Sequence, residues 1–133
     1  MLKKFFFLIA AANLGLLAGC SSTPVKSVQG LFESKAGKTL AMGIDEYVDG
    51  KYPEASKNLQ AALDLGLNPG DQVKAHKYLA FINCVTGKER LCREEFKKAL
   101  DINPDMELEA AEAGHPIWGP VFKSVKIKKP AKK

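Results

Sequence analysis

Two related stretches decide the fold of this chain: residues 43–63 read GIDEYVDGKYPEASKNLQAAL, and residues 80–100 read AFINCVTGKERLCREEFKKAL. The second stretch lies 37 positions after the first, and six positions carry equivalent side chains. They pair as Gly43 with Ala80, Gly50 with Gly87, Ala55 with Cys92, Leu59 with Phe96, Ala62 with Ala99, and Leu63 with Leu100. Such an internal repeat indicates two copies of one structural unit.

The repeated residues have the properties that two packed helices need. Small residues let the helix backbones approach, and the central glycine of each copy allows a left-handed turn between the helices. We expect Leu59 and Phe96 to fill the groove between helices, and Pro69 and Pro104 to end the second helix of each pair. The unit resembles the tetratricopeptide repeat (TPR), whose period is about 34 residues. Apolar residues recur at intervals of three and four residues, and no stretch alternates between apolar and polar residues with period two. The chain is therefore predicted to be all-α.

The segment after the second repeat is predicted to close the array. Two repeats are fewer than the three that such arrays usually need, so their ends require a cover. Glycines and prolines between residues 114 and 120 prevent one continuous helix, but residues 117–122 place apolar side chains at helical spacing. We expect a capping helix within a TPR-like domain over residues 31–122. The alternative is an exposed aromatic docking patch.

The N-terminus has the pattern of an exported lipoprotein. Lys3 and Lys4 precede an apolar stretch at residues 5–17, which is too short for a transmembrane anchor. The run Leu17-Ala18-Gly19-Cys20 resembles the bacterial lipobox, which implies a signal peptide at residues 1–19 and lipid on Cys20. The following serine implies sorting to the outer membrane, facing the periplasm. The alternative is an ordinary secretory signal with a chance cysteine. Residues 20–30 are small and polar, as expected of a lipidated, flexible tether.

The positive charge of the chain lies at its two ends. The formal net charge is +5, but residues 20–122 carry 12 basic and 15 acidic groups, whereas residues 123–133 carry six lysines and no acidic residue. Together with export, this distribution argues against a nucleic-acid partner. The Lys-rich tail at residues 123–133 is expected to be a disordered, solubilising segment. The alternative is electrostatic binding to anionic lipid, lipopolysaccharide or peptidoglycan.

The second half of the chain resembles a specific lipoprotein family. Residues 75–84, 92–100 and 112–122, of which the last contains His-Pro-Ile-Trp-Gly-Pro, are similar to TssQ-type TPR lipoproteins associated with bacterial type VI secretion. The similarity covers about residues 72–125 and the lipobox. It implies a non-enzymatic accessory protein of the cell envelope that contacts a secretion-machine subunit. A pilotin or outer-membrane assembly lipoprotein, and a peptidoglycan-associated binding protein, are the alternatives.

The sequence contains no pattern typical of an active site, so we expect no enzymatic activity and no cofactor. Cys84, Cys92 and His76 lack an evident fourth ligand for zinc, and no metal is expected. Cys84 lies near the end of one predicted helix and Cys92 near the start of the next, which favours a disulfide in an exported domain. The alternative is two buried thiols.

Binding of a protein partner is the predicted role, and TPR arrays usually bind on the face made by the first helix of each pair. An extended or helical segment with an acidic group would suit the mixture of apolar side chains and lysines there. The predicted binding residues are Leu40, Ile44, Tyr47, Lys74, Lys77 and Phe81. The alternative is that the chain's own terminal helices cover the apolar members of this face. The open edge of the array can also pair with a second copy, giving a homodimer.

Overall fold

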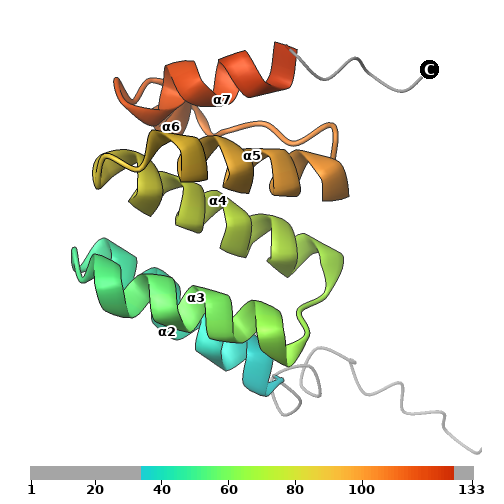
Figure 1. Cartoon of the computed structure of the whole chain (residues 1–133). Coiled ribbons are helices and arrows are strands. Elements are labelled where there is room, and N and C mark those ends of the chain that lie inside the picture. The colour runs from blue at the N-terminus through green and yellow to red at the C-terminus, as the bar shows by residue number, and fades with distance from the viewer. Residues whose placement is uncertain (1–33, 128–133) are drawn as a thin grey trace, which may run out of the picture. The chain divides into compact units, whose positions relative to one another are not determined.

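The computed structural model describes residues 34–127, which form helices joined by turns and short connections, with no strand among them (Figure 1). The predicted signal peptide, the tether with Cys20 and residues 128–133 lie outside the described residues. The helices are α2 (Lys35–Val48), α3 (Tyr52–Leu65), α4 (Pro69–Val85), α5 (Glu89–Ile102), α6 (Ala110–Ala113) and α7 (Trp118–Ile127). The all-α prediction is confirmed. None of these helices is long and apolar enough to cross a bilayer.

Two helical hairpins, α2–α3 and α4–α5, form the body of the domain, and their turns have the same structure. Gly50 and Gly87 have φ angles of 75° and 77°, in the left-handed region. In each turn the glycine N–H donates to the carbonyl three residues earlier, and the next N–H donates to the carbonyl five residues earlier, at 2.8–3.2 Å. This pattern is the Schellman motif, which satisfies carbonyls at a helix end. The two predicted TPR-like units are therefore present.

Close packing within each hairpin follows from the small residues of the repeat. A Cβ atom placed on Gly43 would lie 2.9 Å from Cγ of Leu59, so the first pair of helices requires glycine at this position. Ala55 and Cys92, the equivalent small residues on the second helices, are completely buried. Leu59 and Phe96 are also 0% exposed, as predicted for the residues that fill the groove between helices.

Pro69 does not end the second helix of the first pair, contrary to the prediction from its position. Helix α3 ends at Leu65, and Gly66 follows with a φ angle of 93°. Pro69 instead begins α4, where Asn68 caps the helix by accepting a hydrogen bond from the N–H of Asp71 at 3.0 Å. Proline suits this position because the first turn of a helix does not need its N–H.

The core consists of two neighbouring clusters: one lies where α2 and α3 pack on α4, and the other lies where α4, α5 and α7 meet. The first is built around Leu40, Leu59 and Leu79, and the second around Phe81, Phe96 and residues of α7. Tyr47 and Tyr78 contact both clusters. Within residues 34–127, all buried core residues lie between Ala36 and Val125, and the helices of this range pack into one compact unit. We therefore expect this unit to fold without the residues that precede it.

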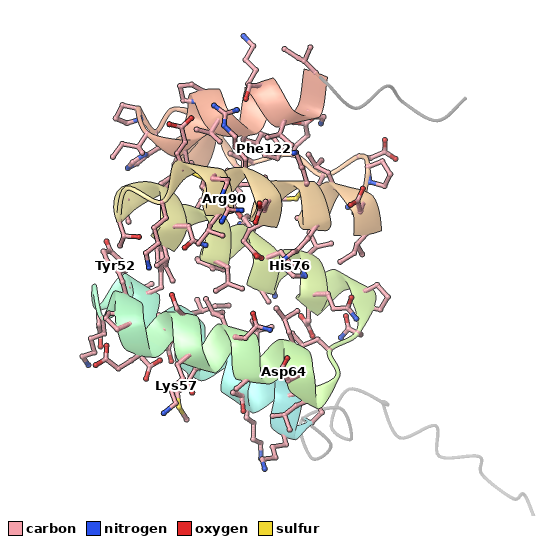
Figure 2. The ribbon with its side chains drawn as sticks, viewed as in Figure 1. Tyr52, Lys57, Asp64, His76, Arg90 and Phe122 are labelled. Atoms are coloured by element: carbon pink, nitrogen blue, oxygen red, sulfur yellow. A yellow bond between two sulfur atoms is a disulfide. The ribbon has the colours of Figure 1, made fainter. Side chains whose placement is uncertain are left out.

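Helix α7 closes the array as a capping helix, as predicted, and it packs on α5 and α4 at the end away from α2 and α3 (Figure 1). Figure 2 shows Phe122 between α7 and α5, where its ring meets the Phe96 ring edge-on at 5.1 Å. The helix runs to Ile127, so residues 123–127, assigned from the sequence to the tail, are helical. Val125 is 5% exposed because it continues the apolar stripe of Val121 and Phe122.

Candidate functional site

A groove on the inner face of the array brings together three of the predicted binding residues. This inner face is formed by α2 and α4, the first helix of each hairpin. The groove has a volume of about 370 Å³. It is lined by Ser34, Gly37, Leu40, Ala41, Ile44, Asn68, Asp71 and Lys74. We call it the α2–α4 groove. Leu40, Ile44 and Lys74 thus lie in one concave site.

The α2–α4 groove combines an apolar floor with a charged edge. Leu40 is buried and Ile44 is half-buried, so both present apolar atoms to the groove without losing their core contacts. Lys74 is about half exposed, and its Nζ lies 3.6 Å from Oδ1 of Asp71. An exposed ion pair at this distance contributes little to stability, so an incoming carboxylate can replace Asp71 at small cost.

Tyr47 belongs to a different part of the inner face, an array of aromatic rings that joins the two hairpins. Its ring lies 5.0 Å from that of Tyr78, 5.9 Å from Tyr52 and 6.2 Å from Phe81. Burial raises the pKa of Tyr47 to about 12, with further contributions from Tyr52, Tyr78 and Glu112. Tyr47 therefore stays neutral at physiological pH and acts as a packing residue between the repeats.

The α6–α7 segment covers Lys77 and Phe81, the two remaining predicted residues. Nζ of Lys77 forms an ion pair with Oε1 of Glu112 at 2.6 Å, and the two side chains are only 14% and 17% exposed. Phe81 is 1% exposed, and the ring of Trp118 stacks on it at 4.4 Å. The alternative considered from the sequence, coverage by the chain's own terminal helix, therefore holds for this half of the inner face.

Sequence reasoning missed Glu112 as a member of the inner face. Glu112 is 35 positions from Lys77, and no repeat or helical spacing relates them. Its backbone carbonyl also accepts a hydrogen bond from the indole N–H of Trp118 at 2.9 Å. The apolar spacing of residues 117–122 did predict a cap, but it did not show which residues of the inner face the cap covers. Ile117, predicted on the apolar face of the cap, is 48% exposed.

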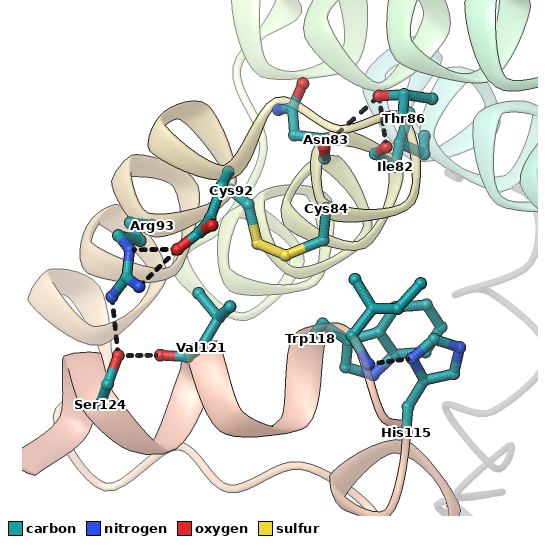
Figure 3. The surroundings of a disulfide bond; sticks show 12 residues. Ile82, Asn83, Cys84, Thr86, Cys92, Arg93, His115, Trp118, Val121 and Ser124 are labelled. Carbon is teal, nitrogen blue, oxygen red and sulfur yellow. Dashed lines mark hydrogen bonds and ion pairs between the residues drawn. A yellow bond between two sulfur atoms is a disulfide. The ribbon is translucent and has the colours of Figure 1, made fainter.

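Cys84 and Cys92 form a disulfide across the α4–α5 hairpin, with their α-carbons 5.1 Å apart (Figure 3). Beside it, Arg93 of α5 donates a hydrogen bond to the hydroxyl of Ser124 on α7 at 2.8 Å. The disulfide and this hydrogen bond tie α4, α5 and α7 together. The hairpin that carries Lys77 and Phe81 is thus cross-linked within itself and hydrogen-bonded to its cap.

His76, considered with the cysteines as a metal ligand, is engaged elsewhere. Its Nδ1 lies 2.6 Å from Oε2 of Glu95, and Nζ of Lys98 lies 2.6 Å from Oε1 of the same carboxylate. Burial alone would raise the pKa of Glu95, but the hydrogen bonds from His76 and Lys98 outweigh it and lower this pKa from its ordinary value. Among residues 34–127, no three His, Cys, Asp or Glu side chains are grouped as a metal site.

Comparison with known proteins supports the TPR-like architecture. No protein-family model matches the chain, and no solved structure matches it significantly. The chain is similar to the photosystem I assembly protein Ycf3 of a Synechococcus strain, with 39% identity over 62 residues, which cover 47% of this chain and 36% of that protein. The same protein of Parasynechococcus marenigrum is 38% identical over 61 residues, which cover 46% and 35%. The chain thus spans about a third of the length of the curated relatives it matches.

Proposed function

We propose that this protein is a non-enzymatic adaptor that binds a segment of a protein partner in the α2–α4 groove. The observation that carries the proposal is that Leu40, Ile44 and Lys74 line one open groove, whereas Lys77 and Phe81 are covered by the chain itself. Apolar side chains of the partner would contact Leu40 and Ile44. An acidic group would meet Lys74, since a carboxylate there gains an ion pair with an exposed lysine.

We further propose that the adaptor is anchored by lipid on Cys20 to the outer membrane and faces the periplasm. The lipobox-like run before Cys20 supports the anchor, and Ser21 supports the location. The resemblance of residues 72–125 to TssQ-type lipoproteins supports a role as an accessory component of a type VI secretion system. The name of the Ycf3 relatives, an assembly protein, favours an adaptor in assembly but not a particular machine. A pilotin or outer-membrane assembly lipoprotein is the second candidate.

Substitutions in the groove test the adaptor role. We expect Lys74→Glu, and separately Ile44→Ser, to reduce the amount of partner recovered with tagged protein from detergent-solubilised membranes. Lys57→Glu is the matched control, because Lys57 is exposed on α3 and points away from the other helices (Figure 2). Lys77→Glu is not a clean test, since it places a second carboxylate beside Glu112. Equal recovery with wild type, Lys74→Glu and Ile44→Ser would exclude the α2–α4 groove as the binding site.

The identity of the recovered proteins separates the two candidate machines. Type VI secretion subunits that are recovered with the wild type but not with Lys74→Glu support the first candidate. Pilus or outer-membrane assembly subunits recovered in the same way support the second.

The lipid anchor is tested separately by Cys20→Ser, which should abolish labelling with radioactive fatty acid and leave the precursor uncut. A Cys20→Ser protein that is still processed and membrane-bound would contradict the lipoprotein proposal. A homodimer formed through the open edge of the array, considered from the sequence, is tested by the sedimentation of purified protein.

A further inference from the structure

Lys77 forms a small carboxylate-binding site on the part of the inner face that the α6–α7 segment covers. Its Nζ lies 5.2 Å from the centre of the Tyr78 ring and 5.7 Å from the centre of the Phe81 ring. The same Nζ lies 2.6 Å from Oε1 of Glu112. We call Lys77, Tyr78 and Phe81 the Lys77 site. Aromatic rings hold the ammonium group on one side, and a carboxylate binds it on the other.

The Lys77 site continues the α2–α4 groove along α4. Lys74, which lines that groove, is three positions before Lys77, so the two lysines lie on one face of the helix, about one turn apart. Tyr47 of α2 contacts the Tyr78 ring at 5.0 Å, so both helices of the inner face meet at the site. A partner segment that lies in the groove and follows α4 therefore reaches the Lys77 site next.

The segment that covers Lys77 is short and adds little to the core. Helix α6 has four residues, none of them buried, and its backbone packs on α7 (Figure 1). The side chain of Glu112 links it to α4. The buried residues on either side of it are Leu108 and Trp118, so residues 109–117 can move while the core stays closed. Short exposed segments of this kind open at a lower free energy than the core does.

Exchange of Glu112 for another carboxylate is easier than opening of α6 alone. Opening alone breaks an ion pair whose side chains are 14% and 17% exposed, and breaking such a shielded pair is costly. An incoming carboxylate restores the ion pair with Lys77. Glu112 competes with it because a group on a short connection has an effective concentration on the order of millimolar. A ligand that is itself held beside the site, in the α2–α4 groove, meets this competition best.

We propose that Glu112 is an internal ligand of the Lys77 site and that an acidic side chain of the partner segment displaces it. The structure shows the chemistry that the site accepts, because a glutamate side chain occupies it. The proposal rests on the proposed binding in the α2–α4 groove. It adds that the chain covers part of its own binding surface. With Glu112 displaced, the open surface extends along α4 from Lys74 to Lys77.

Acetate tests whether the Lys77 site accepts a carboxylate from outside the chain. Glu112→Ala, made in residues 21–133, removes the internal ligand. Sodium acetate should then raise the Tm of this variant above its value in sodium chloride of equal ionic strength, because a ligand that binds the folded state stabilises it. The wild type, whose site is filled, and Lys77→Met/Glu112→Ala, which lacks the ammonium group, should respond less. Equal shifts of Tm in all three proteins would overturn the proposal.

Recovery of the partner tests the displacement. Glu112→Gln keeps an acceptor for the N–H of Glu109, which donates to Oε2 of Glu112 at 3.1 Å. At limiting tagged protein, this variant should recover about fivefold more partner from detergent-solubilised membranes, a coupling typical of two linked binding events. Glu54→Gln, at the exposed start of α3, is the matched control and should change nothing. Adding Lys77→Gln to Glu112→Gln should remove the gain.

The outcomes separate this proposal from the proposed function. Recovery that depends on Lys74 but is not raised by Glu112→Gln would retain the α2–α4 groove and exclude the displacement. Recovery that does not depend on Lys74 would refute the proposed function and, with it, displacement by a partner in the groove. The acetate result then still decides whether the Lys77 site binds an external carboxylate. Circular dichroism confirms that each variant is folded.

Discussion

Reduction of the Cys84–Cys92 disulfide should lower the stability of the domain by an amount that follows from its loop. The cysteines are separated by eight positions, so the bond closes a loop of about nine residues. Loop-closure entropy for a loop of this length corresponds to about 2–3 kcal/mol in the free energy of unfolding. For a domain of fewer than about 100 residues, each kcal/mol shifts Tm by roughly 4–8 °C. We therefore expect Tm to fall by roughly 10–20 °C on reduction.

The measurement compares thermal and urea unfolding of residues 21–133 with and without dithiothreitol, both monitored by circular dichroism. This part of the chain lacks Cys20, so the reductant acts on one disulfide only. The double variant Cys84→Ala/Cys92→Ala is the control, and its unfolding midpoint should not respond to the reductant. Its stability in oxidising buffer should also lie below that of the wild type. Coincident midpoints for the oxidised and fully reduced wild-type protein would refute the argument from loop closure.

Three further predictions concern packing and pH. Gly119→Ala should destabilise the domain by about 1–3 kcal/mol in urea unfolding, because the added Cβ would lie 2.4 Å from the carbonyl oxygen of Ala113. Gly114→Ala is the control and should be tolerated, because the atom nearest to its added Cβ would be 3.6 Å away. Because the pKa of Glu95 is lowered in the folded protein, its ionised carboxylate stabilises the fold, and this stability is lost as the pH falls below the ordinary pKa of 4.5. Glu95→Gln should therefore flatten the acid limb of a Tm–pH curve. An unchanged acid limb would show that other carboxylates dominate the loss of stability in acid. Tyr47→Phe should remove a tyrosinate absorbance transition near pH 12 and lessen the loss of stability as pH rises above 10; a titration identical to wild type would contradict the raised pKa of Tyr47.

The hairpins were predictable from the sequence because their determinants are local and occur twice. Gly50 and Gly87 meet a backbone requirement that depends on neighbouring residues only, and both have the predicted left-handed conformation. Gly43 is small because Leu59 packs against it within the same hairpin. Pro69 was misassigned because proline is compatible both with the end of one helix and with the first turn of the next. Sequence spacing alone does not distinguish these two positions.

The extent of the open inner face was decided by tertiary structure. The six predicted binding residues share one helix face by repeat register, but three of them line a groove, one lies among aromatic rings, and two are covered. The difference arises because α6 and α7 fold back over the second hairpin and bring Glu112 to Lys77 and Trp118 to Phe81. Contacts between residues some 35 positions apart depend on the path of the whole chain, not on local spacing. The sequence alone therefore determined the repeats and their turns, whereas the packing of the C-terminal segment determined which part of the inner face remains open.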